Sequence, residues 1–247
     1  MLRVRSSELE RESAWLSAAR PEVRKRNTAE HGWRMNQFET AMSAALELAT
    51  RGPEFGGNPQ VGAVLLDPSG TIAAEGWHEG AGTDHAEVMA LRNLREKLSL
   101  GQDDRLPAGY TAVVTLEPCN HTGKTGPCAD TLIAAGVDRV VFAATDPGAV
   151  SGGGAEKLAT AGVEVIEGIL EEEANELIRI WRKSTELQRV FVTVKWASTL
   201  DGRTAANDGT SKWISGEEAR FDVHMRRSKI DAIAVGTNTV VVDDPEL

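Results

Sequence analysis

The chain has 247 residues, enough for one large domain or two modest ones, and its 41% hydrophobic and 26% charged residues are ordinary for a soluble globular protein. A net charge of −10 argues against a nucleic-acid partner, because such proteins neutralise phosphates with a basic surface. No apolar run approaches the roughly 18 residues of a membrane helix, and the N-terminus lacks the apolar region of a secretory signal. We therefore expect a cytoplasmic protein that acts on a small molecule, without a membrane partner.

The N-terminal segment, residues 1–35, predicts an irregular and mildly basic arm, since eight Lys/Arg stand against five Glu. Order is expected from Asn36. There Asn36 and Glu39 resemble a capping box, and apolar residues follow at helical spacing. Arg51-Gly52-Pro53 predicts the end of this helix.

Strands and helices alternate along the next part of the chain. The expected elements are strands over 61–66 and 71–77, a helix over 85–97, a strand over 110–116, a helix over 128–135, a strand over 139–144, a helix over 155–161 and a strand over 163–166. This alternation predicts an α/β domain whose parallel or mixed sheet is covered on both faces.

A change of pattern marks the last part of the chain. Residues 171–189 predict one long charged helix, which is followed by expected strands over 190–196 and 232–235 and a helix over 217–228. We place a domain boundary near residue 186. The expected organisation is an arm over 1–35, a first domain over 36–186 and a second domain over 187–247.

Two short stretches carry candidate metal ligands, namely His85-Ala86-Glu87 and the pair Pro118-Cys119 and Pro127-Cys128. A catalytic zinc site needs three N or S ligands and an open position for water, and His85, Cys119 and Cys128 supply three. Glu87 stands where a proton-carrying carboxylate is needed. Cys128 opens a predicted helix, and a helix N-terminus favours the thiolate form.

A plainer interpretation is that the two cysteines are small buried hydrophobes and that His-x-Glu occurs by chance. Both cysteines follow a proline, however, and each stretch lies between a predicted strand and a predicted helix. A purely structural zinc would want a fourth protein ligand, and the sequence offers no third cysteine. We therefore predict a catalytic site with one zinc ion per chain.

From about Asn36 onward the sequence resembles the bifunctional riboflavin-biosynthesis deaminase/reductase family of RibD or RibG type. The resemblance is carried by the runs 58–64 (NPQVGAV) and 115–130 (TLEPCNHTGKTGPCAD), and by His78 seven residues before His85. Eight residues separate the two cysteines, whereas cytidine and nucleic-acid deaminases typically have two there. The implied fold is a three-layer α/β/α domain of cytidine-deaminase type, followed by the start of a dihydrofolate-reductase-like α/β domain.

The resemblance implies a substrate and a pocket. The substrate would be the nucleotide 2,5-diamino-6-ribosylamino-4(3H)-pyrimidinone 5′-phosphate, here called the diaminopyrimidinone ribotide. It would lose its exocyclic amine by hydrolysis, with Glu87 moving the proton from water to ammonia. The implied substrate contacts are Asn58, His78, His121, Lys124 and Thr125.

Residues from about 188 resemble the start of the NADPH-dependent reductase domain of this family. The implied NADPH contacts are Lys195, Ala197, Trp213, Thr239 and Asp243, and the implied substrate contacts are Ser211, Arg227 and Leu247. Because the family continues for more than a hundred residues beyond this point, we expect this half alone not to support reductase catalysis.

Two other functions stay open at this stage. A tRNA or other nucleic-acid deaminase would share the zinc site, although the acidic charge and the spacing of the cysteines argue against it. A zinc-stabilised binding protein with an inactive site would have lost the proton carrier, yet Glu87 is present. The sequence leaves open whether the chain forms a homo-oligomer.

Overall fold

The computed structural model describes residues 28–54, 57–121 and 126–245, and its centre is one five-stranded mixed sheet. The strand order is β2-β1-β3-β4-β5. β1 is antiparallel to β2 and β3, while β3, β4 and β5 run parallel to one another. The strands are β1 (Gly62–Leu66), β2 (Ile72–Trp77), β3 (Thr111–Leu116), β4 (Arg139–Ala144) and β5 (Glu164–Glu167).

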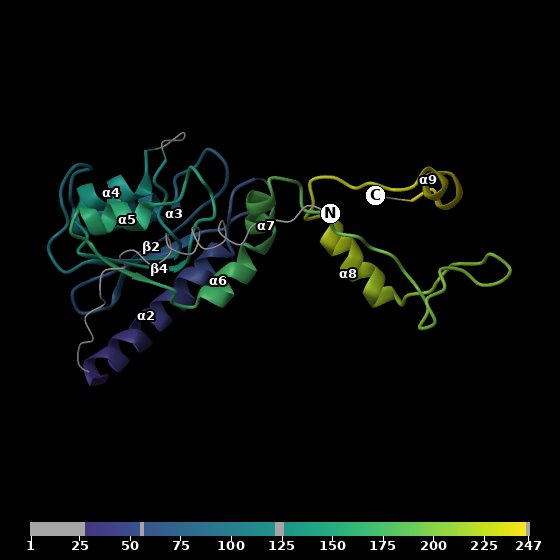
Figure 1. Cartoon of the computed structure of the whole chain (residues 1–247), viewed down its shortest axis with the longest axis horizontal. Helices are drawn as coiled ribbons and strands as arrows, with labels where there is room; N and C mark the ends of the chain where they lie inside the picture. The colour runs from purple at the N-terminus through teal and green to yellow at the C-terminus, as the bar shows by residue number, and fades with distance from the viewer. Residues whose placement is uncertain (1–27, 55–56, 122–125, 246–247) are drawn as a thin grey trace, which may run out of the picture. The chain divides into compact units, whose positions relative to one another are not determined.

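Helices cover both faces of this sheet (Figure 1). One face carries α3 (Ala86–Leu98), α4 (Cys128–Ala135) and α5 (Gly154–Thr160), and the other carries α2 (Thr28–Ala49) and α6 (Glu171–Leu177). None of the helices in the described part of the chain combines the length and apolarity that crossing a bilayer requires.

The core consists of two apolar clusters, one on each face of the sheet. The alternation of side chains along the strands separates them. On β3, Ala112 and Val114 join the cluster under α3 and α4, whereas Val113 joins the cluster under α2. Successive side chains of a strand point to opposite faces, so a strand buried on both sides consists mainly of apolar residues. All six residues of β3 are buried. The prediction of a three-layer α/β/α domain is thus confirmed.

Before residue 190 the helices differ from the sequence prediction in two places. α2 begins at Thr28 rather than near Asn36, so the capping-box pattern does not start the helix. The single helix expected over 171–189 is two helices, α6 and α7 (Arg179–Leu187), which meet at Ile178. Ile178 is buried in the cluster beneath α2 and has non-helical backbone angles, so the chain changes direction where this side chain enters the core.

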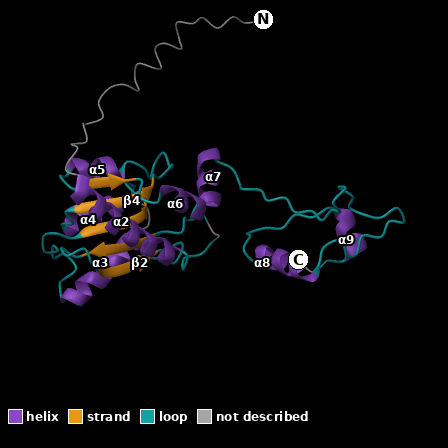
Figure 2. Cartoon of the chain, turned by 90° about the horizontal axis from the view of Figure 1, so that it is seen from below, coloured by secondary structure: helices purple, strands orange, loops and turns teal. Residues whose placement is uncertain are grey.

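The strands predicted over 190–196 and 232–235 are wrong for this structure. Within the described residues after α7, Figure 2 shows loops and the helices α8 (Glu217–Arg227) and α9 (Thr237–Asp243), but no strand. A strand is stabilised by hydrogen bonds to a neighbouring strand, and these segments have none among the described residues. Their apolar side chains are exposed, as at Val192 and Val194.

A close approach at Gly76 fixes α3 against β2. A Cβ added at Gly76 would collide with the carbonyl oxygen of Ala86 and would lie 2.5 Å from the backbone nitrogen of Ala90. Both atoms belong to the backbone of α3, so no side chain could move aside. This contact positions the first turn of α3, which carries Glu87 and follows His85.

We expect Gly76→Ala to lower the free energy of unfolding by about 2 kcal/mol, as overpacked cores do. Urea denaturation followed by circular dichroism measures this difference. Gly126→Ala is the matched control, because an added Cβ there meets no atom of the described residues within 4 Å. Equal stability of the two variants would show that α3 does not approach β2 this closely.

Candidate metal centre and its cavity

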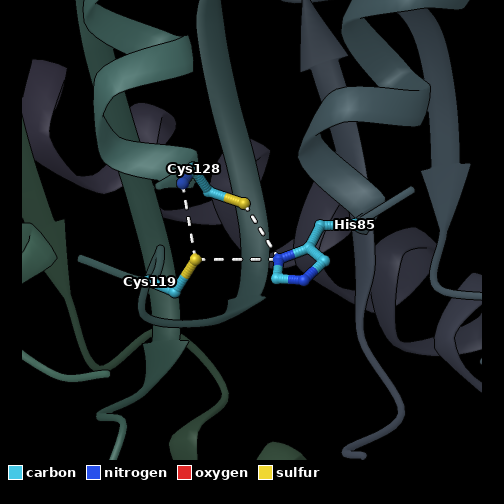
Figure 3. Close-up of side chains that lie close together, drawn as sticks. All are labelled: His85, Cys119 and Cys128. Carbon is cyan, nitrogen blue, oxygen red and sulfur yellow. Dashed lines mark hydrogen bonds between the residues drawn. The ribbon is translucent and has the colours of Figure 1, made fainter. Parts of the chain in front are cut away.

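Three side chains with metal-ligating atoms converge beyond the carboxyl end of β3 (Figure 3). His85 is the N-cap of α3, Cys119 lies three residues after β3, and Cys128 is the first residue of α4. The Nδ1 atom of His85 lies 3.1 Å from the Cys128 sulfur and 3.7 Å from the Cys119 sulfur. All three ligating atoms lie within 4.8 Å of one another.

This arrangement fits a tetrahedral zinc ion. Zinc bonds of about 2.3 Å to sulfur and about 2.0 Å to nitrogen place neighbouring ligand atoms about 3.6 Å apart. The observed separations of 3.1 and 3.7 Å between the His85 nitrogen and the two sulfurs bracket that value. Two thiolates and one imidazole also form a donor set that suits zinc. His85, Cys119 and Cys128 could therefore hold zinc and leave a fourth position open.

The protonation of the two thiols is coupled. A hydrogen bond from the Cys128 thiol, followed by those from the His85 ring and the Cys128 backbone N–H, lowers the pKa of Cys119 to about 4. The same bond to Cys119, together with burial, raises the pKa of Cys128. The hydrogen bond to Cys119 also raises the pKa of His85. The site thus holds protons that a metal cation would displace.

Glu87 is a buried carboxyl group beside these ligands. It lies in the first turn of α3, is 4% exposed and lines the same cavity as His85 and Cys119. Burial raises the pKa of Glu87, because the charged form is poorly solvated there. A carboxyl group whose pKa is raised holds a proton more readily and can act as a general base and then as a general acid.

The cavity, of about 240 Å³, receives three of the five substrate contacts expected for the first domain, Asn58, His78 and His121. His78 Nδ1 lies 3.0 Å from the carbonyl oxygen of Asp84, which can only accept, so Nδ1 carries the proton. The Asn58 carboxamide Nδ2 then donates to His78 Nε2 over 3.0 Å. These two contacts hold the His78 ring in a fixed orientation. The Nδ1 of His121 is buried and has no hydrogen-bond partner among the described residues.

The remaining sequence-predicted contacts either lie outside the described residues or do not line this cavity. Lys124, Thr125 and Leu247 lie outside the described residues, and the side chain of Asp243 is not described. The cavity lining includes none of the other residues expected to contact NADPH or the second substrate. Of these, Ala197 and Arg227 are half-buried, and the exposed ones are Lys195, Ser211, Trp213 and Thr239. Their roles stay predictions.

Sequence reasoning missed Glu117, which lines the cavity and organises its wall. Its buried carboxylate accepts hydrogen bonds from the backbone N–H groups of Asp146, Gly153 and Ala155, over 3.2, 3.1 and 3.0 Å. The loop after β4 is thereby held against the start of the cysteine loop. A glutamate that directly follows a mostly apolar strand was the available signal in the sequence.

Three further lining residues come from chain segments that no motif singled out. Asp146 and Ser151 lie in the loop held by Glu117, and Trp181 lies in α7. The backbone N–H of Asn120 also donates to the carbonyl oxygen of Ser151 over 2.8 Å. One side of the cavity is therefore built by residues far along the chain from the metal ligands.

Comparison with known proteins agrees with this geometry. The family described as "Cytidine and deoxycytidylate deaminase zinc-binding region" matches residues 35–144, and the family "RibD C-terminal domain" matches residues 190–247. The riboflavin biosynthesis protein RibD of Mycobacterium tuberculosis is 46% identical over 86% of this chain and 61% of its own length.

Two solved structures are similar over the same part of the chain. The diaminohydroxyphosphoribosylaminopyrimidine deaminase/5-amino-6-(5-phosphoribosylamino)uracil reductase of Thermotoga maritima matches with a TM-score of 0.74 and 46% identity, over 86% of this chain and 59% of that one. RibD of Acinetobacter baumannii matches with a TM-score of 0.73 and 42% identity, over 85% and 57%.

The chain spans about three fifths of the length of the curated relative from Mycobacterium tuberculosis. Within that span lie a region of cytidine-deaminase type and the beginning of the RibD C-terminal domain. These matches agree with the three-layer fold and with the His/Cys/Cys group. The chain therefore belongs to the RibD family of riboflavin biosynthesis proteins.

Proposed function

We propose that this chain is a zinc-dependent hydrolytic deaminase of riboflavin biosynthesis and that its substrate is the diaminopyrimidinone ribotide. The observation that carries this proposal is the buried carboxyl group of Glu87, which lines one cavity together with the metal-ligating side chains of His85 and Cys119. The activity named for the Thermotoga maritima relative supports the choice of substrate class.

The reaction replaces the exocyclic amine of the pyrimidine ring by the oxygen of water. A new carbon–oxygen bond forms, the carbon–nitrogen bond breaks, and ammonia leaves. Zinc, when bound by three protein ligands, supplies a water whose pKa is lowered to about 7. Glu87 accepts a proton from the attacking water and donates a proton to the departing amine, which its raised pKa suits.

The polar side chains of the cavity hold the ring while this proton moves. The His78 ring and the carboxamide of Asn58 form a fixed pair on one side, and His121 lies on the cysteine loop. Lys124 and Thr125 are the proposed phosphate contacts, since an ammonium group and a hydroxyl both suit a phosphate. Fixed polar groups of this kind orient a substrate without an energetic cost of rearrangement during the reaction.

For the second part of the chain, we propose that residues 190–247 are the beginning of an NADPH-dependent reductase domain. The match of this segment to the RibD C-terminal domain supports the assignment. Lys195, Ala197, Trp213, Thr239 and Asp243 are its proposed NADPH contacts. Ser211, Arg227 and Leu247 are its proposed substrate contacts.

The deaminase proposal is tested by ammonia release from the diaminopyrimidinone ribotide with the zinc-loaded chain. Glu87→Gln should lower kcat by about 10²–10⁴-fold, because the amide cannot carry the proton, while the zinc content stays the same. Glu96→Gln is the matched control, since Glu96 lies exposed on the same helix. Full activity of Glu87→Gln, or deamination of tRNA in place of the ribotide, would contradict the proposal.

The metal ligands are tested by zinc content after purification. We expect one zinc ion per chain in the wild type and a large loss in His85→Asn, because one of three protein ligands is removed. His121→Asn should keep its zinc, since His121 lines the cavity without belonging to the ligand group.

Bound zinc should also dissociate as the pH falls. The raised pKa of His85 lets a proton compete with the metal at a higher pH than an ordinary histidine would. Plasma mass spectrometry of samples dialysed at a series of pH values measures the zinc content of each variant and its dependence on pH. Equal zinc content in the two histidine variants would contradict this ligand set.

A further inference from the structure

The cavity is lined by apolar as well as polar side chains, and one of the apolar side chains is a tryptophan. Trp181 of α7 and Leu116 of β3 both line the cavity. Leu116 is a member of the buried cluster beneath α2 and α6, and Trp181 packs against that cluster. Among the described residues that line the cavity, Trp181 is the only tryptophan, tyrosine or phenylalanine.

The helix that carries Trp181 is fixed to the edge of the sheet. The guanidinium of the next residue, Arg182, donates to the carbonyl oxygen of Thr145 and to the carboxamide oxygen of Asn175, both over 3.0 Å. Arg182 also donates to the carboxylate of Glu186 over 2.9 Å. Ile178, which directly precedes α7, is 4% exposed and anchors the helix in the core.

This anchor places Trp181 at the end of the sheet where the metal ligands converge. Thr145 directly follows β4, whose last residue, Ala144, is paired with Leu116 at the end of β3. The cysteine loop begins there, because Cys119 lies three residues after Leu116. Trp181, the residue before Arg182, lines the same cavity as His85 and Cys119.

We propose that Trp181 contacts the substrate, with its indole ring packed against the face of the bound pyrimidine nucleotide. The inference rests on the deaminase function proposed above. A planar heterocycle is bound well when polar groups meet its edge and an aromatic ring covers its face. The polar side chains of the cavity provide the groups for the edge of the ring, and Trp181 provides the aromatic ring for its face. The helix that follows the deaminase core would then complete the deaminase pocket.

The consequence is a specific effect on binding. Trp181 is not a metal ligand and is not proposed to carry a proton, so its loss should weaken binding and leave the chemical step nearly unchanged. Removal of an aromatic ring that stacks on a base weakens binding by about tenfold or more. We expect Trp181→Ala to raise KM by that factor with little change in kcat, and Trp181→Phe to recover most of the loss.

The kinetic test uses the zinc-loaded full chain and ammonia release from the diaminopyrimidinone ribotide. Ile180→Ala is the matched control, because Ile180 lies on the same helix, is 48% exposed and does not line the cavity. It should keep the wild-type KM. If Trp181→Ala also keeps the wild-type KM, Trp181 only packs α7 onto the core and the inference is wrong.

A fluorescence titration tests the contact itself. Addition of the deaminated product should quench tryptophan emission in the wild type and in Trp196→Phe, which removes a tryptophan that is 70% exposed. Trp181→Phe should lose this response. Because phenylalanine keeps an apolar ring in the core, this result holds even if Trp181→Ala does not fold. An undiminished response in Trp181→Phe would overturn the inference.

A failure of the proposed function would give a different experimental result from a failure of this inference. A wild-type chain that retains zinc yet releases no ammonia from the ribotide would refute the deaminase function, and this inference with it. An active wild type whose KM and fluorescence response do not depend on Trp181 would refute the role of Trp181 alone.

Discussion

The parallel pairing of β3 with β4 is the constraint on which the site depends, because it brings two loops to the same edge of the sheet. Leu116 at the end of β3 is paired with Ala144 at the end of β4. The chain that follows β3 carries Cys119, and the chain that follows β4 carries Asp146 and Ser151. In open α/β sheets, ligands bind outside the carboxyl ends of the strands for this reason.

The two loops are joined by hydrogen bonds rather than by apolar packing alone. Glu117 accepts three backbone N–H groups from the β4 loop and its following helix, and the Asn120 backbone donates back to Ser151. A buried carboxylate needs such donors, since an unpaired buried charge is costly. The need to satisfy Glu117 thus fixes the wall of the cavity next to the metal ligands.

The helices supply the rest of the site through their N-termini. His85 caps α3 and Cys128 opens α4, so both side chains lie at helix ends that face the end of β3. At Cys128 the hydrogen bond to Cys119 and burial outweigh the partial positive charge of the helix N-terminus and raise the pKa of the thiol. The close approach of α3 to β2 at Gly76 fixes the distance between the first turn of α3 and the sheet, and with it the position of Glu87.

Much of this could be predicted from the sequence, for identifiable reasons. The metal group was predictable because its residues lie in two short stretches that combine a His-x-Glu pattern with two Pro-Cys pairs. This combination is typical of a catalytic zinc site. The residues are His85, Glu87, Cys119 and Cys128. The central strands were predictable because burial on both faces favours mostly apolar runs, as in β3, whose polar residues are Thr111 and Thr115.

Other features depend on contacts between distant residues. The hydrogen-bond donors to Glu117 lie 29 to 38 residues further along the chain. Arg182 and Thr145, which are also hydrogen-bonded, are 37 residues apart. No local pattern signals such contacts, so Glu117 and Trp181 were missed. The strands expected over 190–196 and 232–235 failed because propensity alone does not form a strand without a paired neighbour.

The central claim is that His85, Cys119 and Cys128 hold one zinc ion with an open fourth position beside Glu87. X-ray absorption at the zinc edge, measured on the zinc-loaded chain, tests this claim most directly. The account predicts two sulfur neighbours at about 2.3 Å, one histidine nitrogen at about 2.0 Å and one further light atom from solvent. A coordination shell without two sulfurs, or one with a fourth protein ligand in place of solvent, would contradict it.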